Sequence, residues 1–303
     1  MIDKTPIRDL HRRTPWRNLR VVTFAAIWTG AGYTALHVAW LPVRLICYFL
    51  IGATIQGLVI MMHEGVHRIM FRNRTLNRWV AFLCGVPAFL SVTSYRVGHL
   101  SHHRYERSAR DPDEIENFSQ RPRVVALLLL LMLAWGDLYG LYRVGPINTW
   151  RGTPTERRDV LVEYGLIAVA FVAAFALVPL HVLLHVWLLP ALVARQLTNV
   201  RTVAEHALTG HDNRYTATRT VVSNRFVSFF MCNLNYHIVH HLYPAVPWYN
   251  LPALHRLLAD EQRAAGAHVY RSYTQFLVDL ARFAWRALGR GGDSLPLSLQ
   301  RVA

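Results

Sequence analysis

Half of the histidines in this chain lie in three short clusters, and their side chains are the best suited to chemistry. The clusters hold eight of the sixteen histidines, which are His63 and His67, then His99, His102 and His103, and finally His237, His240 and His241. A neutral imidazole is a good ligand for iron, zinc or copper. Positions i, i+3 and i+4 of a helix fall within roughly 100° of one another, so each cluster is expected to aim its imidazoles at one point. The clusters therefore predict a metal centre.

The number of imidazoles and the acids beside them define this centre further. A zinc ion takes about four ligands and an octahedral ion about six, so two metal ions that share the eight histidines are expected. A carboxylate beside a ligating histidine accepts a hydrogen bond from the second ring nitrogen and so fixes the tautomer. Five acidic residues are candidates for this outer role, with a solvated or helix-capping charge as the equal alternative for each: Glu64, Glu106, Asp111, Asp113 and Glu205.

The first cluster also matches the motif of a different enzyme class. The stretch from His63 to His67 has the form HExxH, which in zinc proteases supplies two metal ligands and a glutamate general base. An intramembrane zinc protease would need only these residues and a third ligand, which leaves six of the clustered histidines unexplained. A second HxxxH, from His181 to His185, is expected at the opposite end of the apolar spans, in a helix contact or at the membrane interface.

A metal transporter or sensor is the non-enzymatic alternative. Transporters usually carry polar or ionisable residues inside their spans, where these residues mark the ion path. The apolar spans of this chain contain little of that kind beyond His37 and Glu163, and the histidine clusters lie outside them. An enzyme with a metal centre is therefore the favoured interpretation.

The elements that must position the clusters are apolar stretches long enough to cross a membrane. The chain has 303 residues and is 53% hydrophobic, and blocks of about 20 apolar residues can cross a hydrocarbon core of about 30 Å. The sequence predicts an all-α integral membrane protein with four transmembrane helices in two hairpins and a histidine-rich cytoplasmic cap. The predicted spans are Val21–Leu41, Leu45–Met62, Val160–Leu180 and Val182–Leu197.

Three further segments are expected to lie in the plane of the membrane or at its surface. Gly85 and Pro87 interrupt Trp79–Tyr95, which favours a short in-plane or re-entrant segment. Arginines flank Val124–Tyr142 at both ends, so this segment is placed in the membrane plane. Tyr270–Leu288 alternates apolar residues with arginines, as an interfacial amphipathic helix does.

The charge of the chain predicts its orientation. The formal net charge is +15, and arginine-rich segments beside apolar spans are expected on the cytoplasmic side. The basic arm of residues 1–20, the three clusters and the amphipathic tail of residues 251–303 are all predicted there, as parts of one membrane domain over residues 1–303. Because membrane topology accounts for the charge, nucleic acid is not an expected partner.

The clusters also resemble those of a known family. Their forms and order, HxxxH, HxxHH and HxxHH separated by apolar spans, are similar to the histidine boxes of membrane fatty acid desaturases and their hydroxylase and ketolase relatives. The resemblance covers roughly Met62 to Leu258 and is closest in Asn235–Pro252, which looks like the family's NYHxxHHxxPxxPxxxLP stretch. It implies a di-iron centre that activates dioxygen and removes hydrogen from an unactivated C–H bond. It also implies that the eight clustered histidines are ligands, with His206 as a ninth.

The resemblance implies a reaction as well. The expected activity is O2-dependent desaturation of a fatty acyl chain carried in a lipid or thioester. Hydroxylation or ketone formation on a lipid or carotenoid is the alternative, because the outcome depends on substrate placement at the ångström level. Electrons are expected from a separate donor, either a ferredoxin or a small cytochrome b with its reductase. The arginine-rich face would suit such an acidic carrier or an anionic head group.

Overall fold

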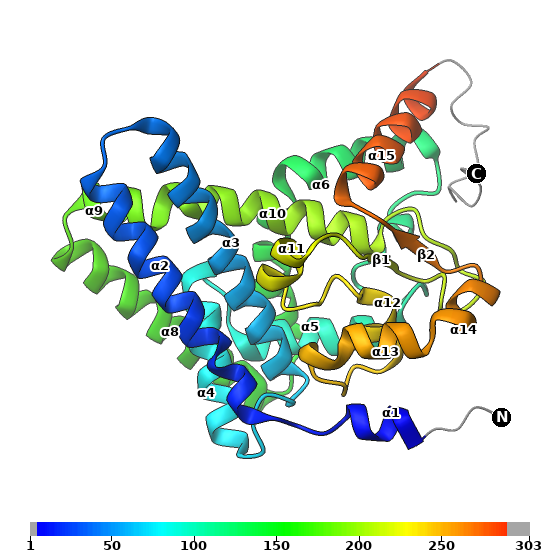
Figure 1. Ribbon diagram of the computed structural model, residues 1–303, viewed down its shortest axis with the longest axis horizontal. Helices are drawn as coiled ribbons and strands as arrows, with labels where there is room; N and C mark the ends of the chain where they lie inside the picture. Colours follow the sequence, from blue (N-terminus) through cyan, green and yellow to red (C-terminus); the bar gives the residue numbers. More distant parts are fainter. Residues whose placement is uncertain (1–4, 290–303) are drawn as a thin grey trace.

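The computed structural model describes residues 5–289 and shows a helical protein with one short pair of strands (Figure 1). The predominantly helical structure fits the predicted all-α class. In the pair of short strands, β1 (Arg219–Val221) runs parallel to β2 (His268–Tyr270). The tail predicted over residues 251–303 is described as far as residue 289. Its remainder, like residues 1–4 of the basic arm, lies outside the described residues.

Within residues 5–289, three helices are long and apolar enough to cross a membrane. They are α3 (Leu41–Val66), α8 (Pro154–Leu177) and the stretch Leu180–His206, which joins α9 (Leu180–Leu183), the π-helical η5 (Leu184–Leu188) and α10 (Leu189–His206). They correspond to three of the four predicted spans. The first predicted span forms the helix α2 (Arg20–His37), which is not among the three because glycines, threonines and polar ends make it less apolar. The fold is therefore of a membrane type, and the arrangement of four crossings in two hairpins stays a prediction.

The segment predicted to be in-plane or re-entrant consists of two helices joined at a sharp bend. The helices α4 (Arg74–Gly85) and α5 (Val92–Tyr105) meet at 96°, with the short η2 (Val86–Ala88) between them. The interruption lies where it was predicted, because Pro87 cannot donate a helical hydrogen bond and crowds the preceding turn. The bend sets the direction of α5, which carries the second histidine cluster.

The central helix of the molecule is α3, in which every residue from Ile51 to Val66 is buried. The helices α2 and α10 pack along it, and α4 packs near its C-terminal end. Glycines permit this close approach, because a Cβ on Gly57 would lie 2.5 Å from the Phe24 ring and one on Gly65 would lie 2.2 Å from Cβ of Ala81. Small residues at such positions allow membrane helices to pack closely. The end of α3, with the first histidine cluster, is thereby held between its neighbours.

Two helices pack together at the end of the molecule opposite α9 in Figure 1, namely α6 (Pro122–Tyr142) and α15 (Tyr273–Leu288). The helix predicted to be interfacial, α15, begins after Ser272, whose side chain caps it, and buries one face against α6 and α10. Its opposite face exposes Trp285, which is 84% exposed. The apolar face of α15 is thus covered by protein, while the predicted position of α6 in the membrane plane stays a prediction. The buried residues that join the two helices are Val125, Ala126, Leu129, Phe276, Leu280, Phe283 and Ala287.

Short elements complete the described chain. The third histidine cluster lies on α12 (His237–Leu242), which packs against β1 and α13 (Leu251–Leu257). The N-terminal arm is fastened to the same region, because the Asn250 side chain donates a hydrogen bond to the carbonyl of Leu10 at 2.7 Å. The remaining elements are α1 (Thr5–Leu10), η1 (Pro15–Leu19), η3 (Ile115–Asn117), the π-helical η4 (Arg143–Ile147), α7 (Asn148–Arg151), α11 (Arg225–Phe230), η6 (Trp248–Asn250) and α14 (Ala259–Ala264).

Candidate metal centre

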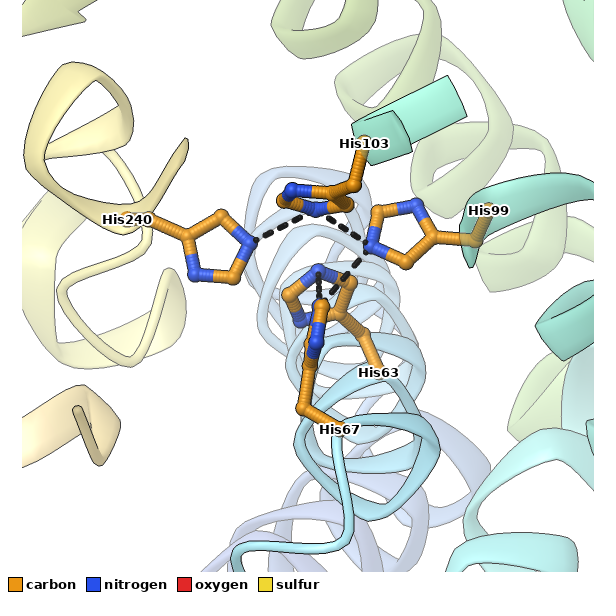
Figure 2. Close-up of side chains that lie close together, drawn as sticks. All are labelled: His63, His67, His99, His103 and His240. Atoms are coloured by element: carbon orange, nitrogen blue, oxygen red, sulfur yellow. Dashed lines mark hydrogen bonds between the residues drawn. The ribbon is translucent and has the colours of Figure 1, made fainter. Parts of the chain in front are cut away.

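The structure gathers all nine predicted histidines in two neighbouring groups. Site A comprises five residues, each with a ring nitrogen within 4.8 Å of the others: His63, His67, His99, His103 and His240. Figure 2 shows these five imidazoles pointing toward one another from α3, α5 and α12. Site B comprises His102, His206, His237 and His241. In site B, Nε2 of His237 lies 2.9 Å from Nε2 of His206 and 3.0 Å from Nε2 of His241.

The second and third clusters are each divided between the two sites, so the expectation that every cluster aims at one point was wrong. In α5, His99 and His103 face site A while His102 faces site B. In α12, His240 faces site A while the other two histidines face site B. The reason is the helical period, because residues four apart lie one above the other whereas adjacent residues diverge by about 100°. Each of these two helices therefore contributes to both sites and holds them side by side.

The spacing of the ring nitrogens fits metal binding. In site A, Nε2 of His99 lies 2.9 Å from Nε2 of His103 and 3.0 Å from Nε2 of His67. The Nε2 atoms of His103 and His240 are 3.3 Å apart. With metal–nitrogen bonds of about 2.1 Å, neighbouring ligands of an octahedral or tetrahedral ion are about 3.0–3.4 Å apart. In site B, the buried Nε2 of His102 has no hydrogen-bond partner, and an ion would satisfy it.

Three of the predicted outer carboxylates lie on the far side of the site B rings, at Nδ1. A partner there holds the proton on Nδ1 and leaves the lone pair of Nε2 facing the site. A carboxylate oxygen of Asp111 lies 2.8 Å from Nδ1 of His102, and one of Glu106 lies 2.7 Å from Nδ1 of His241. A carboxylate oxygen of Glu205 lies 3.5 Å from Nδ1 of His237. Asp111 makes the hydrogen bond that the outer role requires, and Glu106 lies close enough to His241 for one. Glu205 lies at ion-pair distance from His237 without a hydrogen bond.

The other two predicted carboxylates are placed differently. Asp113 lies 3.8 Å from Nδ1 of His102 and is about half exposed. Glu64 lies 3.8 Å from Nδ1 of His63, and it accepts a hydrogen bond from the backbone N–H of Trp248 at 3.0 Å. It thus joins the end of α3 to the segment after the third cluster. A zinc protease would need this carboxylate beside a metal-bound water, whereas Glu64 lies behind the His63 ring, so the protease alternative is not favoured.

Burial favours the neutral form of eight of the nine imidazoles. It lowers the pKa of His237 and His240 well below the usual value, and nearby histidines lower it further. It also lowers the pKa of His67 to about 3.

His102 is the exception: burial lowers its pKa, but the hydrogen bond to Asp111 and the nearby acids outweigh burial and raise the pKa to about 9. Burial raises the pKa of Glu106, but the adjacent His241 outweighs this effect and holds the pKa below its usual range. Metal binding requires neutral imidazoles, so eight of the rings are ready for it, and His102 would release its second proton when a metal binds in site B.

Arg219 on β1 is a buried support of site B that the sequence did not predict. Its side chain is 1% exposed, and burial lowers its pKa to about 10, so it stays protonated at neutral pH. A cation is favoured at the C-terminus of a helix, where carbonyl groups lack partners. Because α10 ends at His206, this contact determines where that imidazole enters site B. The guanidinium donates to three carbonyl oxygens at this end, those of Ala204, Ala207 and Leu208.

Arg107 is a second unpredicted support, and it organises the acidic loop that follows α5. Its backbone N–H donates to Asp111 at 2.9 Å, and its φ of 58° is left-handed. Its side chain donates to Glu114 and, at 2.7 Å, to the carbonyl of Thr209. The loop is thus tied to the segment after α10, and Asp111 is held against His102. A single arginine in a charged run offers no sequence pattern that would have identified this role.

The remaining HxxxH motif is not part of the centre. His185 on η5 is hydrogen-bonded through Nδ1 to the hydroxyl of Tyr48 on α3, which confirms the predicted helix contact. His181 on α9 is exposed. Both lie at the end of the spans opposite the two sites, as expected from their place before α10 (Figure 1).

Most of the chain is similar to known proteins. Residues 39–274, which include all nine histidines, match the family model for fatty acid desaturases. The chain is 24% identical to an sn-1 oleoyl-lipid 12-desaturase of Arthrospira platensis over 76% of this chain and 72% of that protein. It is 26% identical to a sphingolipid delta(4)-desaturase/C4-monooxygenase of Bos taurus over 86% of this chain and 80% of that protein. A sphingolipid delta(4)-desaturase of Drosophila melanogaster is also 26% identical, over 80% and 73% of the two chains.

Proposed function

This chain belongs to the fatty acid desaturase family, and we propose that it introduces a double bond into the acyl chain of a membrane lipid, with dioxygen as the oxidant. The observation that carries the proposal is the pair of adjacent all-histidine sites at the ends of membrane-length helices. The related proteins named as oleoyl-lipid and sphingolipid desaturases support a lipid substrate.

Two iron ions are the proposed metals, one in each site, with the nine histidines as their ligands. When bound, the pair supplies the activation of dioxygen and the removal of two hydrogens from the acyl chain. An all-imidazole set suits this task, because neutral ligands leave the ions strongly electrophilic. The split of α5 and α12 between the sites supports a paired centre, because neither helix can move without disturbing both sites.

The chain's own residues hold the centre ready. Asp111 keeps the proton of His102 on Nδ1, so that Nε2 keeps its lone pair for a metal. Glu106 does the same for His241. Five of the nine histidines are buried and the other four are partly buried, which limits the access of bulk water and strengthens the electrostatic interactions inside the site. The residues thus supply orientation and a dry environment, while the metals supply the redox chemistry.

The proposed orientation places both histidine sites and both termini in the cytoplasm, with four membrane crossings. It is supported by the way α3 and the stretch Leu180–His206 both reach the centre with their C-terminal ends. Electrons would come from a separate donor, a ferredoxin or a small cytochrome b with its reductase. The formal charge of +15 would favour an acidic carrier on that side through electrostatic steering.

The proposal can be tested by expressing the chain in a host of known lipid composition and analysing its acyl chains. We expect a new double bond, about two irons per chain, and loss of both product and metal in His240→Ala. His181→Ala is the matched control, because this exposed histidine also belongs to an HxxxH motif but lies outside the centre. Hydroxylated acyl chains as the main product would establish the hydroxylase alternative instead. One zinc per chain that His240→Ala leaves in place would contradict the whole proposal.

A further inference from the structure

Glu163 is a buried carboxylate within α8, a helix long and apolar enough to span a membrane. Its side chain is 1% exposed and lies outside both histidine sites. An ionisable group within a membrane span is costly, so its presence requires partners and points to a role.

The partners of Glu163 are four hydrogen-bond donors on the bent helix pair, three of them at the N-terminus of α5 and one on Arg78 of α4. Its Oε2 accepts from the Ser91 hydroxyl at 2.6 Å and from the Thr93 backbone N–H at 3.0 Å. Its Oε1 accepts from the Thr93 hydroxyl at 2.7 Å and from the Arg78 guanidinium at 3.1 Å. An ionised carboxylate can only accept hydrogen bonds, so it satisfies all four donors at once.

These contacts fasten the N-terminus of α5 to α8. Ser91 is the N-cap of α5, and an anion is favoured at the N-terminus of a helix. Two more acids of α8 extend the contact toward its start. Asp159 pairs with Arg78 at 2.9 Å, and Glu156 pairs with Arg96 of α5 at 2.6 Å. The three acids follow helical spacing along one side of α8, and Glu163 is the most buried of them.

We propose that Glu163 is a positioning residue for the metal centre and sets the location of α5 along its own axis. The 96° bend separates α5 from α4, so no continuous helix fixes this location. A helix rises about 1.5 Å per residue and moves as a rigid rod. Any slip at Ser91 therefore reaches His99, His102 and His103 undiminished, whereas metal–ligand distances tolerate only about 0.2 Å. Because α5 contributes to both sites, Glu163 supports both.

The test is Glu163→Gln with metal affinity as the readout, measured by titrating the full-length protein with a chelator. In either orientation, the amide NH2 of glutamine faces two of the four donors. We expect affinity at both sites to fall about tenfold or more, with helical content unchanged in circular dichroism and partial recovery in Glu163→Asp. Asp159→Asn is the matched control, because it contacts the same Arg78 but is more exposed, and it should keep near wild-type affinity.

A second variant keeps the proposal testable if Glu163→Gln does not fold. Thr93→Val removes one donor and retains the carboxylate, and it should lower metal affinity several-fold in a folded protein. Unchanged affinity in Thr93→Val, or in a folded Glu163→Gln, would overturn the proposal, as would an equal loss in Asp159→Asn. The inference rests on the proposed metal centre. A wild-type protein without bound metal would refute the metal centre itself, whereas variants that keep their metal would refute only the role of Glu163.

Discussion

Replacing Asp111 by asparagine should weaken metal binding at site B, because the carboxylate accepts three hydrogen bonds that an amide cannot all accept. Its Oδ1 accepts from Nδ1 of His102 at 2.8 Å and from the backbone N–H of Asp113 at 2.9 Å. Its Oδ2 accepts from the backbone N–H of Arg107 at 2.9 Å. All three partners are donors, and asparagine has only one acceptor atom, so its NH2 group must face at least one of them.

The size of the effect follows from the two orientations of the amide. If the NH2 replaces Oδ2, the N–H of Arg107 loses its acceptor. If it replaces Oδ1, His102 must carry its proton on Nε2, where the proton blocks the lone pair that a metal needs. A buried donor without a partner costs about 1–3 kcal/mol. Losing the outer partner of a ligating histidine lowers metal affinity about 10–100-fold. This factor corresponds to about 1.4–2.8 kcal/mol, which agrees with the cost of a buried donor without a partner.

The assay is metal retention by the full-length protein against increasing chelator, with metals counted by elemental analysis. We expect one of the two ions to leave Asp111→Asn at a chelator concentration about 10–100-fold lower than in the wild type. Asp113→Asn is the control, because this side chain is about half exposed and lies 3.8 Å from His102, and it should behave nearly as the wild type does. Equal retention in Asp111→Asn and the wild type would refute the reasoning that this carboxylate fixes the tautomer.

Four further predictions concern stability, each read from melting curves in detergent. Arg219→Met leaves three buried carbonyls without a donor and should lower the free energy of unfolding by about 3 kcal/mol or more. Arg219→Lys should retain only part of the stability that the arginine provides. Gly65→Ala places a Cβ 2.2 Å from Ala81 and should cost about 1–3 kcal/mol; Gly30→Ala, with nothing within 4 Å, is its control. Because the pKa of Glu106 is lowered in the folded protein, its ionised form stabilises the fold. This contribution is complete above the usual glutamate pKa of about 4.3, and it is lost as the pH falls through the lowered pKa. Chelation should lower the melting temperature, because bound metal stabilises only the folded state.

Each of these predictions has a result that would contradict it. Wild-type stability in Arg219→Met would show that the end of α10 needs no buried cap. Equal melting temperatures for Gly65→Ala and Gly30→Ala would mean that α3 and α4 can separate without cost. A Glu106→Gln variant that loses stability in acid as steeply as the wild type would remove Glu106 from the pH dependence. A melting temperature that chelator leaves unchanged would argue against a metal bound in the folded protein.

Much of the architecture could be predicted from local patterns. Three apolar stretches became membrane-length helices, and Gly85 with Pro87 marked the bend between α4 and α5. The first predicted span, Val21–Leu41, also became a helix, but its glycines and threonines make that helix less apolar than the other three. The two strands were missed because each is only three residues long, and their pairing joins segments about 50 residues apart. Local periodicity carries no information on such a pairing.

The sequence by itself identified the eight clustered histidines as candidate ligands, because helical spacing presents them on defined faces wherever the helices lie, whereas His206 was expected from the family resemblance. Helical spacing already turns the adjacent His102 and His103 about 100° apart, but only the tertiary structure decided which other histidines each of them meets. It also decided that Arg219 caps α10 and that Glu163 fastens α5. The physical reason is the range of the interactions: a helical face follows from the residues within one or two turns, whereas a buried charge finds its partners on whichever distant helix packs against it.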